Sequence, residues 1–114
     1  MLKETIKNIH NLNDVKISTV HSGIKNKSSK EDDLLLIEFD KDANIAGLFT
    51  KSLTSSAPVN QCKHNIKFSK SPSVKAIIVN SGNANAFTGK AGDETVLNVS
   101  KYLSKKFSCN INQI

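Results

Sequence analysis

Two near-continuous apolar runs constrain the fold of this 114-residue chain more than any other feature. They are "LLLIEF" at residues 34–39 and "AIIV" at residues 76–79. Both have the length of a strand, and a strand that is apolar at almost every position buries both of its faces. A sheet made of such strands needs a covering layer on each side. The sequence therefore predicts an α/β (α+β) fold, a layered sandwich of mixed β-sheet with covering helices.

The sequence offers one strongly amphipathic helix to cover this sheet. It is predicted over residues 91–107, where apolar side chains recur on one stripe, acidic residues come first and lysines come last, an order that suits the helix dipole. A weaker helix is predicted to begin at Ser55 or Ser56, with Pro58 in its first turn. Because two helices are too few for both faces of the sheet, we expect the single domain 1–114 to be the N-terminal portion of a larger fold.

The remaining segments are assigned from their local patterns. Residues 15–20 alternate apolar and polar side chains, as in a half-buried strand, and residues 21–33 read as an exposed loop. Residues 44–53 follow the turn-like "DKDA" and are expected to pair with the first apolar run, with Gly47 at a bulge or a close backbone approach. Residues 1–13 have apolar groups at near-helical spacing, a pattern that fits a helical arm and a flexible arm equally well.

The composition narrows the class of protein. With 38% apolar and 23% charged residues, and no apolar run near the ~20 residues of a membrane span, we expect a cytoplasmic globular protein without a membrane partner. The formal net charge of +6 comes from lysine alone, without the arginine that is best suited to phosphate or guanine recognition. We therefore expect no nucleic-acid partner. Because the net charge is positive, a basic nucleic-acid-binding protein is kept as the second alternative function. Cys62 and Cys109 are expected to be reduced thiols.

A polar loop, "NSGNANAFTG" at residues 80–89, separates the second apolar run from the strong helix. This order of strand, Gly- and Asn-rich loop and helix aims backbone N–H groups and a positive helix end at one point, which suits a phosphate, a carboxylate or an oxyanion. The loop matches neither common glycine pattern of nucleotide-binding sites, which weakens the case for nucleotide binding. The same strand–loop–helix order still makes a non-catalytic anion- or nucleotide-binding α/β module the first alternative function. In a purely structural interpretation, Gly82 and Gly89 supply positive φ angles and the asparagines bond their own backbone.

Three other candidate groups suit a structural or solvated role better than chemistry. Cys62 and His64 form a C-x-H pair, but no second Cys pair accompanies them, so no metal site is expected. Ser22 and Ser81 lack the G-x-S-x-G context of a nucleophile. Lys25 can neutralise an anionic group, although such a lysine is more often solvated.

The polar loop and its surroundings resemble the ornithine acetyltransferase family, the bifunctional glutamate N-acetyltransferases of arginine biosynthesis. "VNSGNANAFTGKAG" is similar to the family pattern N-[SA]-G-x-A-N-A-x-T-G with a later glycine, and "GIK", "AGLFT" and "APV" precede it in the family's order. The resemblance covers residues 20–114. Phe87 stands where the family commonly has Cys, and we expect its ring to pack beneath the loop and leave the neighbouring donors intact.

The resemblance implies a precursor that cleaves itself before an internal Thr, which becomes the nucleophile of a β chain and carries acetyl from N-acetylornithine to glutamate. It implies that Thr88 and Gly89 form the oxyanion hole, in the N-terminal part of the α chain of a hetero-oligomer (a heterotetramer) of α and β chains. It implies no cofactor, with acetyl-CoA as an additional acetyl donor in some parent enzymes. Thr95 lies in the predicted helix and is no substitute for the nucleophile, so the chain alone is expected to be inactive.

Overall fold

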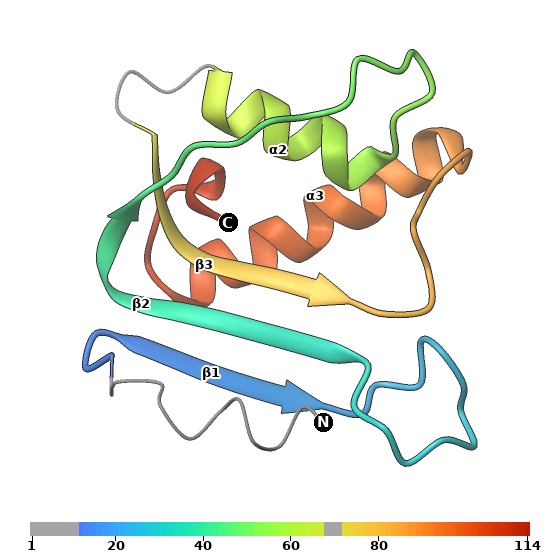
Figure 1. Ribbon diagram of the computed structural model, residues 1–114, viewed down its shortest axis with the longest axis horizontal. Coiled ribbons are helices and arrows are strands. Elements are labelled where there is room, and N and C mark those ends of the chain that lie inside the picture. Colours follow the sequence, from blue (N-terminus) through green and yellow to red (C-terminus); the bar gives the residue numbers. More distant parts are fainter. Residues whose placement is uncertain (1–11, 68–71) are drawn as a thin grey trace.

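The computed structural model describes residues 12–67 and 72–114, which form one sheet with helices packed against it (Figure 1). The arm predicted over residues 1–13 therefore lies almost entirely outside the described residues. The strands are β1 (Val15–Val20), β2 (Leu34–Asn44) and β3 (Ser73–Asn80). The helices are α2 (Ala57–Lys67), α3 (Gly89–Lys106) and the short 3-10 helix η2 (Ile111–Gln113). The α+β class predicted from the two apolar runs is confirmed.

The central strand β2 pairs in antiparallel fashion with β1 on one edge and with β3 on the other. Ile37 of β2 stands between Ile17 of β1 and Ile77 of β3. The register between β2 and β3 shifts between Glu38 and Ala43, as at a β-bulge, and the pairing resumes at Ala43. Within the described residues the sheet is antiparallel throughout rather than mixed.

The strand predicted over residues 44–53 is wrong. β2 continues to Asn44 through the "DKDA" segment that was expected to turn, and both of its edges are already occupied by β1 and β3. The chain beyond Asn44 therefore has no edge of β2 to pair with, and it runs as a loop in which Leu48 and Leu53 are fully exposed. Gly47 lies in this loop and not at a bulge, and a Cβ there would meet side chains rather than another backbone, with the Phe49 ring 2.9 Å away.

The predicted helices are confirmed, with a shift in one boundary. α2 has Pro58 in its first turn, where the missing N–H group costs nothing. α3 begins at Gly89, two residues earlier than predicted, so the acidic Asp93 and Glu94 fall in its second turn while lysines close its last turn. Among the described residues, no helix combines the length and the apolarity needed to cross a membrane.

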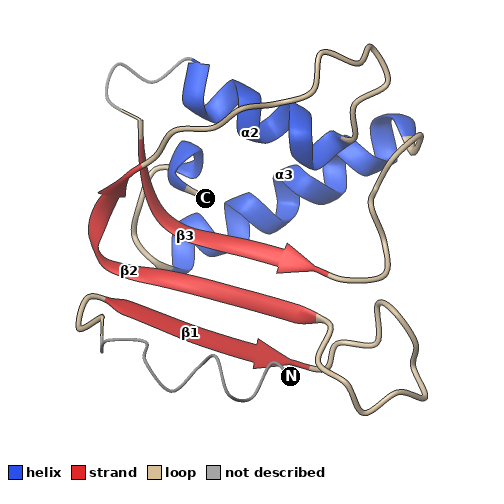
Figure 2. Cartoon of the chain, in the orientation of Figure 1, coloured by secondary structure: helices blue, strands red, loops and turns tan. Residues whose placement is uncertain are grey.

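The core lies between β3 and the helical layer (Figure 2). Val74 and Ala76 of β3 and Leu103 of α3 are buried, and α2, α3 and η2 contact one another above them. The alternation of side chains sends Leu35 and Ile37 of β2, with Thr19 and Ile17 of β1, to the opposite face. On that face Ile17 of β1 is 67% exposed, so the half-burial predicted for this strand is not found. The sheet is thus apolar on both faces, and the described helices cover one of them.

Candidate functional site

The Asn80–Gly89 loop runs from the end of β3 to the first residue of α3 (Figure 1). Its asparagines hold its shape, because Asn80 Nδ2 donates to the Asn83 carbonyl at 2.8 Å and Asn83 Oδ1 accepts from the Asn85 backbone N–H at 2.8 Å. The carbonyl of Asn85 accepts from the N–H of Ala57, the first residue of α2, at 3.3 Å. Side-chain amides thus supply the partners that the loop backbone lacks, and the loop is tied to the starts of both helices.

The loop backbone is strained. Asn85 and Phe87 have φ angles of 47° and 58°, in the left-handed region that side-chain-bearing residues avoid, and Gly82 and Gly89 have φ angles of 99° and 56°. A left-handed residue other than glycine costs on the order of 1 kcal/mol and persists only where its surroundings hold it. Such strain clusters at functional sites, which favours a role for this loop beyond a turn.

The packing predicted for Phe87 is wrong. Its side chain is 87% exposed and projects away from the loop instead of packing beneath it. The left-handed φ angle of Phe87 explains the difference, because it turns the Cα–Cβ bond away from the direction that an ordinary extended or helical backbone would give it. Phe87 is also one of the residues that line a polar pocket with Thr88 and Gly89.

Thr88 is the N-cap of α3, yet its hydroxyl does not cap the helix. Thr88 Oγ1 donates instead to Asn85 Oδ1 at 2.6 Å, and Asn85 Nδ2 donates to the Gly92 carbonyl at 2.9 Å. The first N–H groups of α3, beginning with Gly89, have no partner within the helix and gain none from the Thr88 side chain. They remain a ready donor set at the positive end of an 18-residue helix.

Gly92 makes room for this cluster. A Cβ at Gly92 would lie 1.9 Å from Thr88 Oγ1 and 2.6 Å from Asn85 Oδ1, far inside van der Waals contact. A Cβ at Gly89 would meet nothing within 4 Å, so Gly89 is needed for its left-handed φ angle and its open side faces free space. The two glycines of the loop end therefore have different reasons to be glycine.

Thr88 and Gly89 share one wall of a polar pocket of about 230 Å³. Its other walls come from the segment before α2, from α2 and from α3, with Ser55, Asn60 and Asp93 among the lining residues. The structure therefore brings together the two residues predicted as donors and places them beside open space.

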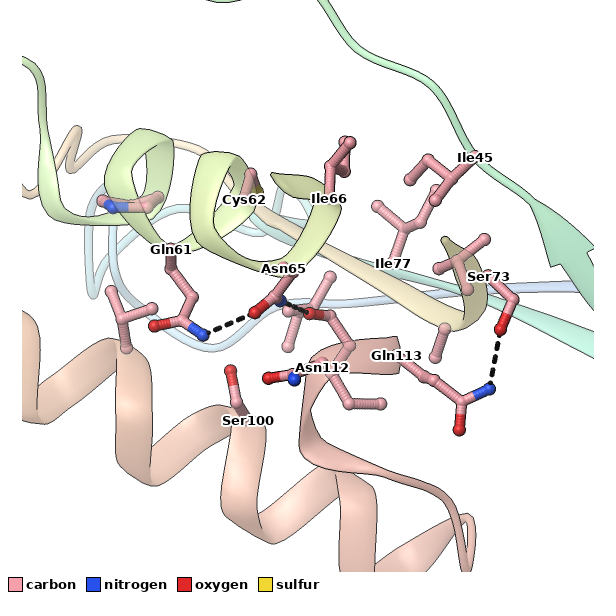
Figure 3. A pocket seen from close by; sticks show the side chains of 16 residues that line it. Ile45, Gln61, Cys62, Asn65, Ile66, Ser73, Ile77, Ser100, Asn112 and Gln113 are labelled. Carbon is pink, nitrogen blue, oxygen red and sulfur yellow. Dashed lines mark hydrogen bonds between the residues drawn. The ribbon is translucent and has the colours of Figure 1, made fainter. Parts of the chain in front are cut away.

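A second pocket, of about 180 Å³, lies between α2, η2 and β3 (Figure 3). Its polar groups bond to one another, since Asn65 accepts from Gln61 Nε2 at 2.8 Å and donates to the Ile114 carbonyl at 2.9 Å, and Gln113 donates to Ser73 Oγ at 3.0 Å. Among the described residues no buried side-chain N or O atom lacks a partner. With mainly apolar walls and paired amides, this pocket is less suited to chemistry than the one at Thr88.

A buried carboxylate shapes the neighbouring loop after β1. Asp33 is 3% exposed, and its Oδ1 accepts from the Ser22 hydroxyl at 2.7 Å and from the Ser22 backbone N–H at 2.6 Å. Its Oδ2 accepts from the Lys25 N–H at 3.0 Å. These donors, the Ser22 hydroxyl above all, hold the pKa of Asp33 well below its usual range, because they stabilise the charged form.

Asp33 also connects this segment to the Asn80–Gly89 loop. Its carbonyl accepts from the Ser81 N–H at 2.8 Å. A Cβ at Gly82 would lie 2.4 Å from the Lys25 Cα, so the two loops touch backbone to backbone. Asp33 was not among the residues predicted from the sequence, although its position directly before an apolar strand was the available signal. The Lys25 ammonium, considered for an anion, lies 3.5 Å from Glu31 and is largely exposed.

The other sequence candidates lie apart from Thr88 or serve the helices. Thr95 donates from its hydroxyl to the Ala91 carbonyl at 2.8 Å within α3, as a helical threonine does. Cys62 and His64 lie on α2 with exposed side chains, and Cys62 and Cys109 are both free thiols. Within residues 12–67 and 72–114, no cluster of three His, Cys, Asp or Glu side chains could hold a metal ion.

An α+β layer with a strained, amide-rich loop at a helix N-terminus is suited to a group that carries or develops negative charge. Residues 16–114 match the sequence model of the ArgJ family. The chain belongs to the ArgJ family, which confirms the family predicted from the loop and its upstream motifs.

Two curated relatives carry the name arginine biosynthesis bifunctional protein ArgJ. The chain is 43% identical over 96 residues to that of Bartonella henselae, covering 84% of this chain and 22% of the relative. It is 43% identical over 100 residues to that of Brucella suis, covering 88% of this chain and 23% of the relative. The chain thus spans less than a quarter of the length of these two relatives.

Two solved structures share the fold. The crystal structure of arginine biosynthesis bifunctional protein ArgJ from Bacillus halodurans aligns with a TM-score of 0.76 at 27% identity, covering 87% of this chain and 49% of that chain. Ornithine acetyltransferase from Mycobacterium tuberculosis, complexed with ornithine, aligns with a TM-score of 0.71 at 30% identity, covering 88% of this chain and 52% of that chain. The arrangement described above therefore recurs in solved structures of the family.

Substitution of Gly92 tests the close contact with Thr88. A Gly-to-Ala change inside a helix normally stabilises it by about 0.5–1 kcal/mol, but the added methyl group here overlaps the Thr88 hydroxyl. We expect Gly92→Ala to lower the free energy of unfolding by about 1–3 kcal/mol. Gly89→Ala is the matched control and should cost about 1 kcal/mol, from its left-handed φ angle alone. Chemical denaturation measures both, and a Gly92→Ala protein more stable than wild type contradicts the contact.

Substitution of Asp33 tests the buried carboxylate. Because its pKa is depressed in the folded state, its stabilisation is fully present above its unfolded pKa of about 3.9 and is lost as the pH falls further. We expect Asp33→Asn to lower the Tm at pH 7 by roughly 5 °C or more, and the gap from wild type to narrow progressively as the pH falls below about 4. Asp32→Asn, at an exposed neighbour, is the control. A gap that stays constant from pH 7 to pH 3 contradicts this role.

Proposed function

We propose that this chain supplies the oxyanion-stabilising part of an acetyltransferase that moves acetyl from N-acetylornithine to glutamate through an acetyl-threonine intermediate. The observation that carries the proposal is the shared pocket of Thr88 and Gly89 at the N-terminus of α3. Membership of the ArgJ family supports the reaction class, and two relatives are named as bifunctional proteins of arginine biosynthesis.

The chemistry of acetyl transfer requires such donors twice. In the first half-reaction a threonine hydroxyl attacks the acetyl carbonyl of N-acetylornithine, a C–O bond forms and the carbonyl oxygen becomes an oxyanion. Collapse of this intermediate breaks the C–N bond, and the leaving amine of ornithine takes up the proton that the threonine hydroxyl gives up. The neutral amine of glutamate then attacks the acetyl ester and a second oxyanion forms. Its collapse breaks the bond between the acetyl carbon and the threonine oxygen, and that oxygen takes up the proton that the glutamate nitrogen loses. One donor pair can meet the negative charge in both steps.

Thr88 and Gly89 suit this role by geometry and electrostatics. One contributes a hydroxyl and the other a backbone N–H group without an intrahelical partner, and both line the same pocket. The N-terminal end of α3 adds a partial positive charge that favours an anion at this point. The open side of Gly89 leaves room for the substrate carbonyl to approach.

The nucleophile is assigned to a partner β chain with an N-terminal threonine. Thr95, the next threonine after the loop, lies inside α3, and its hydroxyl donates a hydrogen bond to the Ala91 carbonyl. The active protein is therefore proposed as a cytoplasmic hetero-oligomer of α and β chains that needs no cofactor, with acetyl-CoA as an additional acetyl donor in the bifunctional version. The isolated 114-residue chain should not transfer acetyl groups.

Thr88 variants of the full-length enzyme test the proposal. Thr88→Ala should lower kcat by about 10²- to 10³-fold with little change in KM, the usual result of removing one oxyanion donor. Thr88→Ser keeps the hydroxyl and should retain much more activity. Thr95→Ala, nearly two turns into α3, is the control and should leave kcat nearly unchanged. A Thr88→Ala enzyme with normal turnover per active site would remove Thr88 from the reaction, and a loss of thermal stability alone would assign it a structural role.

A further inference from the structure

The hydroxyl proton of Thr88 is already in use. Thr88 Oγ1 lies 2.6 Å from Asn85 Oδ1 and 3.4 Å from the Asn85 carbonyl oxygen. A threonine hydroxyl has one proton, so it cannot donate to Asn85 and to a substrate oxyanion at the same time. The proposed donor must therefore change partners during the reaction.

Asn85 is held too firmly to be an incidental partner. Its Nδ2 donates to the Gly92 carbonyl at 2.9 Å, which leaves Oδ1 facing the Thr88 hydroxyl. Its backbone N–H and carbonyl bond to Asn83 and Ala57, and its φ angle of 47° is maintained against strain. Half-buried and fixed at each of its polar groups, Asn85 sets the direction in which the hydroxyl of Thr88 points.

We propose that Asn85 is the positioning residue for Thr88: its amide oxygen holds the hydroxyl in a resting hydrogen bond, which is exchanged for one to the substrate oxygen as negative charge develops. This inference rests on the proposed function. No covalent bond of Thr88 breaks in the exchange. The hydroxyl turns toward the substrate oxygen, and a rotation about the Thr88 Cα–Cβ bond moves Oγ1 out of hydrogen-bond distance of Asn85 Oδ1. The half-buried Asn85 Oδ1 then accepts from water.

The strengths of the two hydrogen bonds explain why the exchange waits for the reaction. A neutral substrate carbonyl competes with the Asn85 amide oxygen on roughly equal terms, because both are neutral acceptors. An oxyanion forms a charge-assisted bond that is roughly twice as strong, so it draws the proton away from Asn85. An interaction made mainly in the transition state raises kcat and leaves substrate binding almost unchanged.

A double-mutant cycle in the full-length enzyme tests the proposal. Asn85→Ala should lower kcat by about 10-fold with KM within about 2-fold of wild type, the effect of one mispositioned hydrogen bond. In the Thr88→Ala background the same change should have almost no further effect on kcat, because Asn85 acts through Thr88. Full additivity of the two losses overturns the proposal.

Asn80→Ala is the matched control, because Asn80 shapes the same loop through the bond from its side chain to the Asn83 carbonyl and not through a bond to Asn85 or Thr88. Its effect on kcat should be the same with and without Thr88, and an Asn80 effect that also vanishes in the Thr88→Ala background overturns the assignment to Asn85. Asn85→Asp covers the case in which Asn85→Ala does not fold. Its carboxylate accepts the hydroxyl more strongly, so kcat per folded enzyme should fall by about 10-fold or more. Normal kcat in Asn85→Asp overturns the resting-bond role.

The same experiments separate this inference from the proposed function. Normal turnover in Thr88→Ala removes the oxyanion role of Thr88 and the inference with it. A slow Thr88→Ala enzyme combined with a fast Asn85→Ala enzyme keeps the proposed function and overturns the role of Asn85 alone.

Discussion

The contact of Thr88 and Asn85 with the bare Cα of Gly92 governs the geometry of the site. A side chain at Gly92 would occupy the space of the Thr88 hydroxyl, so the loop could not close onto α3. Closure lets the Asn85 amide reach the Gly92 carbonyl, and this bond fixes the amide oxygen toward Thr88. The left-handed φ angles at residues 85, 87 and 89 are the conformational cost of this closure, and the hydrogen bonds to Asn83 and Ala57 offset it.

The sheet brings two loops to the same end of the molecule. Val20 of β1 and Asn80 of β3 both pair with Leu34, the first residue of β2, so the loops that follow β1 and β3 leave side by side. Asp33, one residue earlier, binds the first loop through its carboxylate and the second through its carbonyl. Gly82 then allows the two backbones to touch. The antiparallel pairing of β2 with both of its neighbours therefore determines which segment contacts the Asn80–Gly89 loop.

The elements that the sequence predicted correctly are those with a strong local pattern. The apolar runs became β2 and β3, and the charge order and apolar stripe of residues 91–107 became α3. The strand wrongly predicted over residues 44–53 shows what a local pattern cannot predict. Its pairing depended on which edges of β2 were already occupied by other strands. Strand occupancy is a property of the whole fold, and it cannot be read from one segment.

The candidate residues of the site could be proposed from the sequence, and the residues that support them could not. Thr88 and Gly89 stood out through the polar loop and its family motif, and they do share a pocket. Phe87 is exposed because its backbone is left-handed, and no sequence pattern predicted a left-handed φ angle at this residue. Asp33 owes its role to partners 8 and 11 residues away, brought back to it by the turn between β1 and β2.

A structure of the full-length enzyme with a tetrahedral phosphonamidate analogue of N-acetylornithine tests the central claim most directly. The account predicts that the analogue's oxyanion-mimicking oxygen lies about 2.7–3.1 Å from both Thr88 Oγ1 and the Gly89 nitrogen. It also predicts that Thr88 Oγ1 has left Asn85 Oδ1, with a separation beyond about 3.5 Å. An oxygen held by other donors, with the Thr88 hydroxyl still bonded to Asn85, would contradict the account.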